Sequence, residues 1–392
     1  MRTADTDRGM WSATTDVVVP IHGGRPITER CLEALESQTQ EHRVIVVDNA
    51  SPDDSLNAIR KRFPNVELLE LGENRGYAAA CNAGIAYGTG AAVVLLNNDV
   101  IAPPRFLAHL LAPLAADTRL GSTASLLLQP DMSVIDSAGL SADPTLAGFP
   151  RLQGHSERSA TTRHPMLLGP TGAAGAYRRA ALAQVGGLDE RIFLYQEDLD
   201  LALRLCAAGW GTVLASDARA IHLGSNTVGR GSAAQRCHAG TARGYMLRRY
   251  GVLRGRRAPR ALATEAIVVA ADAALSHDFA SLRGRLAGWR SARKIAASQP
   301  PSDGLDSTIG FLASMRLRRS DRKVAAGANP PLQPKSPWSR GTAPADHRLE
   351  APARERAAGP LFGSPSAADR RQMRLEPRVP EILVDRPGAP GD

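Results

Sequence analysis

Residues 44–53, with the sequence VIVVDNASPD, decide the fold: a run of β-branched residues ends in a carboxylate and a polar turn. The apolar run predicts a buried strand, and the turn after it favours the start of a helix. Similar apolar runs occupy residues 16–19, 66–71 and 92–96, each separated from the next by one segment with helical spacing. Strands without polar alternation, joined through single helices, indicate a sheet that is covered on both faces. The sequence therefore predicts an α/β fold with a mostly parallel central sheet.

Charge and proline are distributed unevenly along the chain. Residues 228–298 contain 14 Lys and Arg against 3 Asp and Glu, so this segment carries +11 while the whole chain carries +9. The last part of the chain holds 14 of the 27 prolines and little apolar surface, a composition typical of disorder. We therefore expect four parts: a flexible N-terminus (1–14), an α/β domain (15–227), a basic helical extension (228–298) and a disordered tail (299–392).

Several features favour a cytoplasmic protein. The most apolar segment, residues 261–275, is interrupted by Glu265 and Asp272, so no membrane-spanning helix is expected. The first seven residues lack the apolar core of a signal peptide. The four cysteines are far apart in the sequence and are expected to be reduced thiols. Aromatic residues make up only 4% of the chain. So few aromatics argue against a stacking surface for single-stranded nucleic acid.

The first strand is followed by PIHGG, residues 20–24, and not by a dinucleotide-binding glycine motif. A nicotinamide or flavin site would require GxGxxG at this point, and an NTPase would require GxxxxGK followed by Ser or Thr. The chain contains neither motif in the expected place. An oxidoreductase and a P-loop enzyme are therefore disfavoured.

Two carboxylates follow predicted strands, where ligands of open α/β sheets bind. Asp48 could accept hydrogen bonds from a nucleobase or a ribose, although a turn carboxylate that starts the next helix would look the same. Asp99 ends the strand in Asn97-Asn98-Asp99 and could hold a divalent cation that bridges a diphosphate, since phosphates and waters supply the other ligands. The alternative is a polar strand end.

The acidic stretch at residues 197–200 opens a predicted helix. The helix dipole alone explains acids at this position, but Asp198 could also serve as a general base with Glu197 beside it. His222 lies in a polar loop with Gly, Ser and Thr, where it could meet phosphate or metal. A packed or surface histidine is the alternative.

The succession VVVP, VDNASPDDS, GENRGYAAACNAGI, LLNNDV, GPTGAAGAYRRAALAQVGGLDERIFLYQEDLDLALRLCAAGWG and HLGSNT resembles the inverting family 2 glycosyltransferases of GT-A fold. Within that family it is most similar to the rhamnosyltransferase-type branch. The resemblance extends from about residue 16 to residue 227, and residues 169–209 are its most specific part. It implies that residues 15–227 form the GT-A glycosyltransferase domain.

The resemblance also implies roles for individual residues. Asp198 matches the catalytic base, with Glu197 beside it; Asp99 and His222 match groups that approach the metal or the diphosphate. The residues expected on the donor side are Pro20, His22, Asp48, Asn49, Asn74, Gly76, Asn82, Asn97 and Asn98. Relatives often carry a Tyr after the first strand, where this chain has Ile21-His22.

The implied activity is that of a metal-dependent, inverting hexosyltransferase that uses Mg²⁺ or Mn²⁺. It would move a sugar, with rhamnose as one candidate, from a nucleotide-diphospho-sugar to a hydroxyl of a glycan or lipid-linked acceptor in cell-envelope or polysaccharide synthesis. A catalytically inactive nucleotide-sugar binding protein is one alternative. A basic nucleic-acid-binding protein is another, although no nucleic acid is expected because the chain lacks a reading motif.

The basic extension suggests a further partner. Seven arginines between residues 243 and 260 are interleaved with apolar residues, among them Tyr245, Met246 and Tyr250. Cations mixed with apolar residues on a helix suit an anionic bilayer, so residues 228–298 are expected to dock on the inner face of the plasma membrane. A solvated basic face on helices that only support the catalytic domain is nearly as good an interpretation.

Overall fold

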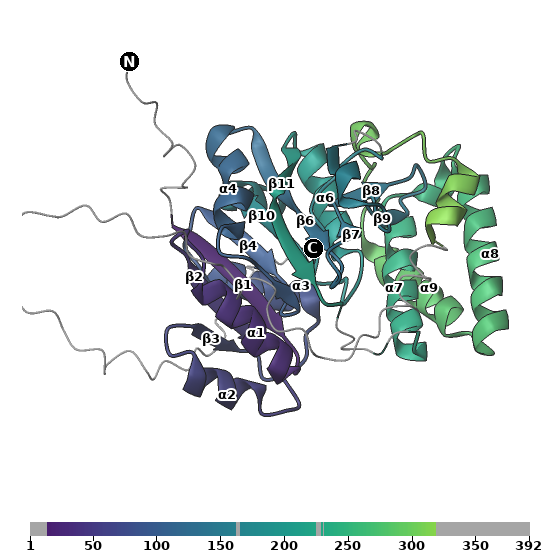
Figure 1. Ribbon diagram of the computed structural model, residues 1–392. Coiled ribbons are helices and arrows are strands. Elements are labelled where there is room, and N and C mark those ends of the chain that lie inside the picture. Colours follow the sequence, from purple (N-terminus) through teal and green to yellow (C-terminus); the bar gives the residue numbers. More distant parts are fainter. Residues whose placement is uncertain (1–13, 162–164, 225–228, 230, 319–392) are drawn as a thin grey trace, which may run out of the picture. The chain divides into compact units, whose positions relative to one another are not determined.

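The computed structural model describes residues 14–161, 165–224, 229 and 231–318. Its centre is a nine-stranded sheet with the order β3-β2-β1-β4-β10-β6-β11-β5, and β7 pairs with β6 (Figure 1). The strands of this sheet are β1 Thr15–Ile21, β2 Arg43–Asp48, β3 Glu67–Glu70, β4 Ala92–Leu96, β5 Val100–Ile101, β6 Leu120–Leu128, β7 Ile135–Ser137, β10 Ala174–Arg178 and β11 Gly211–His222. Strands β8 Leu140–Ala142 and β9 Gly148–Pro150 form a separate antiparallel pair.

Helices cover both faces of the sheet. The helices are α1 Arg25–Glu36, α2 Ser55–Arg62, α3 Tyr77–Tyr87, α4 Phe106–Ala116, α5 Arg179–Val185, α6 Glu197–Ala207, α7 Ala233–Arg249, α8 Ala258–Ser276 and α9 Ala280–Ser291, with 3-10 turns at Glu157–Thr161, Val252–Arg254, Ala292–Lys294 and Ser302–Gly304. Because side chains alternate along a strand, Val17 and Val19 join the core cluster that contains α1 and α4 residues. Val18 joins the cluster on the other face, with α3, α5 and α6 residues.

The first four strands are parallel, as the sequence predicts. All seven residues of β1 and all five of β4 are buried, which explains why these strands appear as unbroken apolar runs. Strand β10 is antiparallel to both β4 and β6, so the sheet as a whole is mixed. The α/β class is confirmed, and the parallel arrangement is confined to β3-β2-β1-β4 and the β6–β11 pair.

Strand β11 is longer than the sequence suggests. It runs from Gly211 to His222, and His222 pairs with Val100 of β5. Its pairing with β6 shifts between Ala215 and Arg219, and this irregularity hides the continuity of the strand in the sequence. The expectation that His222 lies in a loop is therefore wrong: it is the last residue of a strand.

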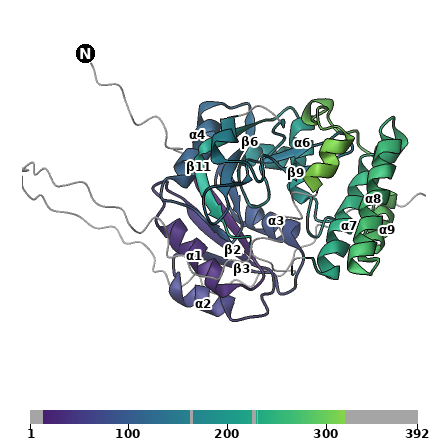
Figure 2. The ribbon, with the colours of Figure 1, turned by 45° about the vertical axis from the view of Figure 1, so that its right-hand side comes forward.

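The basic extension forms helices, as expected, but it does not have a core of its own. One apolar cluster combines Leu199 and Leu203 of α6 with Tyr245 and Met246 of α7. Helices α7 and α9 pack with their backbones in close contact. Gly244 lies so near the backbone of Arg285 that an added Cβ would collide with it. Figures 1 and 2 show α7, α8 and α9 grouped together beyond α6. The helices are thus part of the same compact unit as the sheet.

The apolar residues that were expected to enter a membrane lie in this core. Tyr245, Met246 and Tyr250 are buried, and the side chain of Arg243 in α7 is only 3% exposed. Arg243 donates to Glu265 at 2.7 Å and to the carbonyl of Leu146. The prediction that these residues dock on a membrane is therefore wrong. Their apolar side chains pack in the core, and Arg243 forms its hydrogen bonds inside the fold.

The disorder expected from residue 299 does not begin there. Leu305 and Ile309 are 6% and 4% exposed, and residues 311–318 form a short helix. The Asp306 carboxylate accepts the Met166 N–H at 2.7 Å, and its own N–H donates to the carbonyl of Ala142. The prediction is wrong for residues 299–318; the rest of the expected tail, and the expected flexible N-terminus up to residue 13, lie outside the described residues.

Candidate active site

The carboxyl ends of β1 and β2 carry a hydrogen-bonded group of predicted donor-side residues. The Asn49 amide is at its centre: Nδ2 donates to Asn74 Oδ1 at 3.0 Å and to the Gly76 carbonyl at 3.2 Å. The Asn49 carbonyl accepts from His22 Nδ1 at 2.9 Å. Asn49 comes from the loop after β2, whereas Asn74 and Gly76 both come from the loop before α3, so these bonds fix the two loops against each other.

Asp48 lies at the end of β2 and is buried. Its Oδ1 accepts the Ser51 N–H at 3.1 Å, which is the bond that a turn carboxylate makes. On the neighbouring strand β1, Ile21 pairs with Asp48 and Pro20 pairs with Val47. The structure therefore shows the turn role of Asp48, and its contact with a nucleobase stays a prediction.

The end of β4 is held by three neighbouring elements. The Asn97 N–H donates to the Ala173 carbonyl at 2.8 Å, and Asn98 Nδ2 donates to Thr28 Oγ1 of α1 at 2.8 Å. The Asp99 side chain is 4% exposed. The Asp99 carbonyl accepts the Leu223 N–H at 2.9 Å, just after the end of β11. These contacts bring Asp99 and His222 together across the β5–β11 pair.

His222 lies between two carboxylates. Its Nε2 is 3.4 Å from Asp99 Oδ1, and its Nδ1 donates to Asp136 Oδ2 at 2.7 Å. Burial of the ring opposes its charged form, but Asp99 and Asp136 together raise the pKa of His222 to about 10. Asp136 was not among the predicted site residues, since it lies 86 positions from His222 in a region without regular periodicity.

The pair formed by Asp99 and His222 fits a cation that is held mainly by its substrate. Across the described part of the chain, no group of three or more His, Cys, Asp or Glu side chains is arranged to hold a metal ion. A carboxylate oxygen and an imidazole nitrogen that face each other at 3.4 Å can nevertheless both be ligands of one ion. A hard cation between diphosphate oxygens needs few protein ligands.

The two acids at the start of α6 have different surroundings. Tyr195 and Gln196 adopt left-handed backbone angles, with φ of 71° and 64°, and turn the chain into the helix. Glu197 is 6% exposed, whereas Asp198 is only partly buried. Asp198 Oδ2 accepts the Gly172 N–H at 2.8 Å, and Oδ1 accepts the Leu199 N–H at 2.7 Å. Asp198 is thus held by the backbone and reaches the surface.

Burial affects the ionisation of both acids. It raises the pKa of Glu197 well above the usual value, and the neighbouring Asp198 charge raises it further. Burial also raises the pKa of Asp198, although the N–H groups of Gly172 and Leu199 favour the charged form. Two adjacent carboxylates, one buried and one partly buried, do not ionise together readily, so the N–H bonds make Asp198 the member that carries the charge.

A turn at residues 172–173 joins the two halves of the candidate site. Gly172 binds Asp198 through its N–H and accepts the Tyr77 hydroxyl at 2.5 Å, while Ala173 accepts the Asn97 N–H. The end of β4, the start of α3 and the start of α6 therefore meet at this turn. Tyr77 and Gly172 were not among the predicted site residues, although the Gly-rich passage around residue 172 was part of the recognised motif.

Asn82 is not brought into this group. Its Nδ2 donates to the Leu188 carbonyl at 2.9 Å and to Glu190 at 3.0 Å, and its Oδ1 accepts the Leu188 N–H. The side chain thus holds the turn at residues 187–190 against α3. The structure shows this positioning role and no contact of Asn82 with the other predicted donor-side residues.

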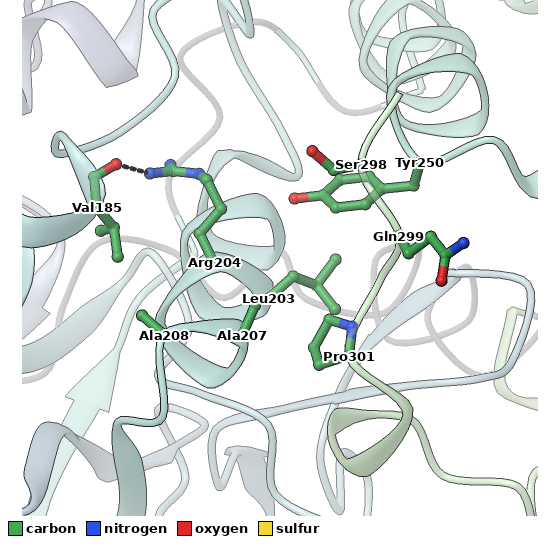
Figure 3. A pocket seen from close by; sticks show the side chains of 9 residues that line it. All are labelled: Val185, Leu203, Arg204, Ala207, Ala208, Tyr250, Ser298, Gln299 and Pro301. Atoms are coloured by element: carbon green, nitrogen blue, oxygen red, sulfur yellow. Dashed lines mark hydrogen bonds between the residues drawn. The ribbon is translucent and has the colours of Figure 1, made fainter. Parts of the chain in front are cut away.

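A pocket of about 300 Å³ opens elsewhere on α6 (Figure 3). Its lining residues are Val185, Leu203, Arg204, Ala207, Ala208, Tyr250, Ser298, Gln299 and Pro301. None of these is a predicted site residue. Arg204 donates to Asp200 and to the Val185 carbonyl, each at 2.7 Å, so Asp200 and Arg204 form an ion pair along α6.

Comparison with known proteins identifies the family. A family model described as glycosyl transferase family 2 matches residues 16–186. The N-acetylglucosaminyl-diphospho-decaprenol L-rhamnosyltransferase of Mycobacterium tuberculosis is 33% identical over 238 residues, which cover 55% of this chain and 77% of that protein. The chain belongs to glycosyl transferase family 2. The family 2 resemblance stated from the sequence, including its rhamnosyltransferase-like branch, is thereby confirmed, and this family member is a glycosyltransferase.

Other similar proteins are more distant from this family 2 glycosyltransferase. The O-antigen biosynthesis protein RfbC of Myxococcus xanthus is 28% identical over 222 residues, covering 53% of this chain and 17% of that protein. Among solved structures, the mannosyltransferase PcManGT from Pyrobaculum calidifontis, in complex with GDP-Man and Mn²⁺, has a TM-score of 0.46 and 20% identity. That match covers 80% of this chain and 87% of PcManGT.

No helix in the described ranges is both long enough and apolar enough to cross a bilayer.

Proposed function

We propose that this glycosyltransferase moves L-rhamnose from a nucleotide-diphospho-sugar to a hydroxyl of a sugar that is linked through a diphosphate to a membrane lipid. The choice of sugar and acceptor is supported by the name of the Mycobacterium tuberculosis relative, at 33% identity over 238 residues. The observation that carries the proposal is the meeting of Asp198 with the end of β4 through the turn at residues 172–173. That link supports a role for the Asp198 carboxylate next to the predicted diphosphate site.

In the proposed reaction Asp198 is the general base. The acceptor oxygen attacks the anomeric carbon, its proton passes to the Asp198 carboxylate, and the bond from the anomeric carbon to the diphosphate oxygen breaks. One base is sufficient, because a nucleoside diphosphate is already a good leaving group. A single displacement of this kind inverts the anomeric configuration.

Glu197 supports this role from the interior. Its pKa is raised by burial and by Asp198, so it holds its proton at neutral pH and adds no second charge beside the base. We propose that the neutral Glu197 positions the start of α6 and that only Asp198 touches the acceptor. The greater exposure of Asp198 supports this division.

Asp99 and His222 are the residues that would hold a Mg²⁺ or Mn²⁺ ion, with Asp136 as a positioning residue. When bound, such an ion neutralises the charge that develops on the departing diphosphate. Asp136 accepts a hydrogen bond from Nδ1–H of His222 and so leaves Nε2, which faces Asp99, as the nitrogen that would bind the ion once the ion displaces its proton. The donor-side loops at His22, Asp48–Asn49 and Asn74–Gly76 would contact the nucleotide.

A lipid-linked acceptor implies work at a membrane surface. We propose that the protein acts as a peripheral protein on the cytoplasmic face of the plasma membrane. The buried positions of Tyr245 and Met246 mean that the contact must use residues other than those first expected.

The function is tested by incubating the protein with TDP-, UDP- and GDP-sugars and a soluble N-acetylglucosamine-diphospho-lipid analogue, with product measured by mass spectrometry. Rhamnose added to the analogue is the expected result. Donor binding without turnover would instead indicate a nucleotide-sugar binding protein. Salt-sensitive retention of nucleic acid, without sugar transfer, would indicate the nucleic-acid-binding alternative.

A further inference from the structure

Helix α8 exposes apolar side chains over most of its length. Only Ala261, Thr264 and Glu265 of its 19 residues are buried. Leu262 is 54% exposed and Leu275 is 73% exposed, and Phe279, just after the helix, is 64% exposed. An ordinary surface helix of a globular protein turns such residues toward a core and presents charges to water. Here the exposed residues of α8 are Ala, Leu and Ile, apart from Pro259 at its start.

Charged residues around α8 are arranged at its ends. Between residues 261 and 282 there is no Lys or Arg, and the two acids of the helix, Glu265 and Asp272, are buried and half-buried. Arg254 and Arg256 are exposed just before the helix, and Arg283 is exposed in the first turn of α9. The helix is therefore an apolar segment with exposed cations before it and after it.

This combination fits an anionic lipid bilayer. Apolar side chains of an interfacial helix enter the boundary between head groups and acyl chains, while arginines pair with lipid phosphates. Figure 1 shows α8 on the outer side of the group formed by α7, α8 and α9, with α7 between α8 and the sheet. A bilayer could thus approach α8 without meeting the sheet.

We propose that the α8 surface, defined as residues 254–283, docks the protein on an anionic bilayer. The charge complementarity comes from Arg254, Arg256 and Arg283, and the choice of a bilayer over another apolar partner rests on the proposed lipid-linked acceptor. The contact differs from the one first expected in the extension: it uses side chains that the fold leaves exposed, not the apolar residues that lie in the core.

The test is flotation of the full chain with vesicles of phosphatidylglycerol and phosphatidylcholine in equal parts, and with vesicles of phosphatidylcholine alone. Leu262→Glu combined with Leu275→Glu should abolish flotation, because both positions are exposed and the new charges oppose insertion. Arg254→Gln combined with Arg256→Gln should weaken partition about thirtyfold, at about fivefold per arginine.

Matched controls separate this surface from general charge and exposure. Arg60→Gln on α2, an arginine whose side chain is 53% exposed, and Tyr87→Gln on α3, an exposed aromatic residue, should float like the parent chain. Near-ultraviolet circular dichroism of the leucine variant checks that it is folded. None of these positions belongs to the candidate active site.

Binding to anionic vesicles that falls with rising salt, and that only the α8 variants lose, supports the proposal. Equal flotation of the leucine variant and the parent overturns it, as does an absence of flotation by the parent at low salt. A self-associated parent that the leucine variant converts to a monomer, again without flotation, would show that a second copy covers α8. Transfer to the soluble acceptor analogue is measured separately, so a failure of docking is distinct from a failure of the proposed activity.

Discussion

Replacing Asp198 with Asn should remove the base while leaving the fold in place. Without a group that accepts the acceptor's proton, turnover should fall about 10² to 10⁴-fold, equivalent to about 3–5 kcal/mol in the activation barrier. Donor affinity should change little, since the donor-side contacts come from other loops.

The structure also sets the expected cost to stability. The Asp198 carboxylate accepts two N–H groups, from Gly172 at 2.8 Å and from Leu199 at 2.7 Å, and a carboxamide can accept at only one oxygen. One of these N–H groups loses a charged partner, at a cost of about 1.5–3 kcal/mol. Relief of charge beside buried Glu197 offsets part of this cost. The variant should therefore remain folded at the assay temperature, as urea unfolding can verify.

The assay is initial-rate sugar transfer to the soluble acceptor analogue, with donor binding measured by calorimetry on the same samples. Glu190→Gln is a matched control, because Glu190 is an exposed acid close in sequence and outside the proposed chemistry. It should stay within about twofold of the parent rate, far from the range expected for loss of a general base. A folded Asp198→Asn enzyme that keeps more than about a tenth of the parent turnover would refute the assignment, leaving Asp198 a helix-start acid.

Three further predictions concern single contacts. Glu197 keeps its proton in the folded state up to about pH 8 but loses it near 4.5 when unfolded, so its contribution to stability should fall by about 1.4 kcal/mol per pH unit across this window. Glu197→Gln should therefore reduce the pH slope in a series of urea unfolding curves, and an unchanged slope would assign it to other groups. Asp136→Asn should weaken Mn²⁺ binding about 10 to 100-fold in titrations with nucleoside diphosphate, while the exposed control Asp131→Asn should not. Equal Mn²⁺ affinities of the two variants would show that Asp136 does not orient His222. A chain ending at residue 318 should have the same free energy of unfolding as the full chain. A chain ending at residue 298 should be less stable by about 3–6 kcal/mol, because it lacks the buried side chains of Leu305 and Ile309. Equal stability of the two shortened chains would show that these side chains add nothing.

The sequence was most informative where structure is local. The strands β1, β2 and β4 could be predicted because each is a run of β-branched or apolar residues that is buried on both faces. The acids at positions 197 and 198 could be placed at the start of a helix because local signals mark such starts. Strand β10 could not be placed, since the short stretch AGAYR gives no period and its antiparallel direction depends on tertiary contacts.

Contacts between distant segments account for the remaining differences. The bond from His222 to Asp136 spans 86 positions, and the one from Tyr77 to Gly172 spans 95, so no local pattern announces either. The order of residues 299–318 depends largely on the two apolar side chains Leu305 and Ile309 within a proline-rich composition. The sequence alone predicts a surface cation at Arg243, because its buried partner Glu265 lies 22 positions away.

The anomeric configuration of the product tests the account most directly. Transfer is run with a nucleotide-sugar of known configuration, and the new glycosidic bond is examined by proton and carbon NMR as soon as it forms. A single displacement with Asp198 as the only base predicts a product whose configuration is opposite to that of the donor. Retention of the donor's configuration would require a second displacement or a different route at the anomeric carbon, and would contradict the proposed site.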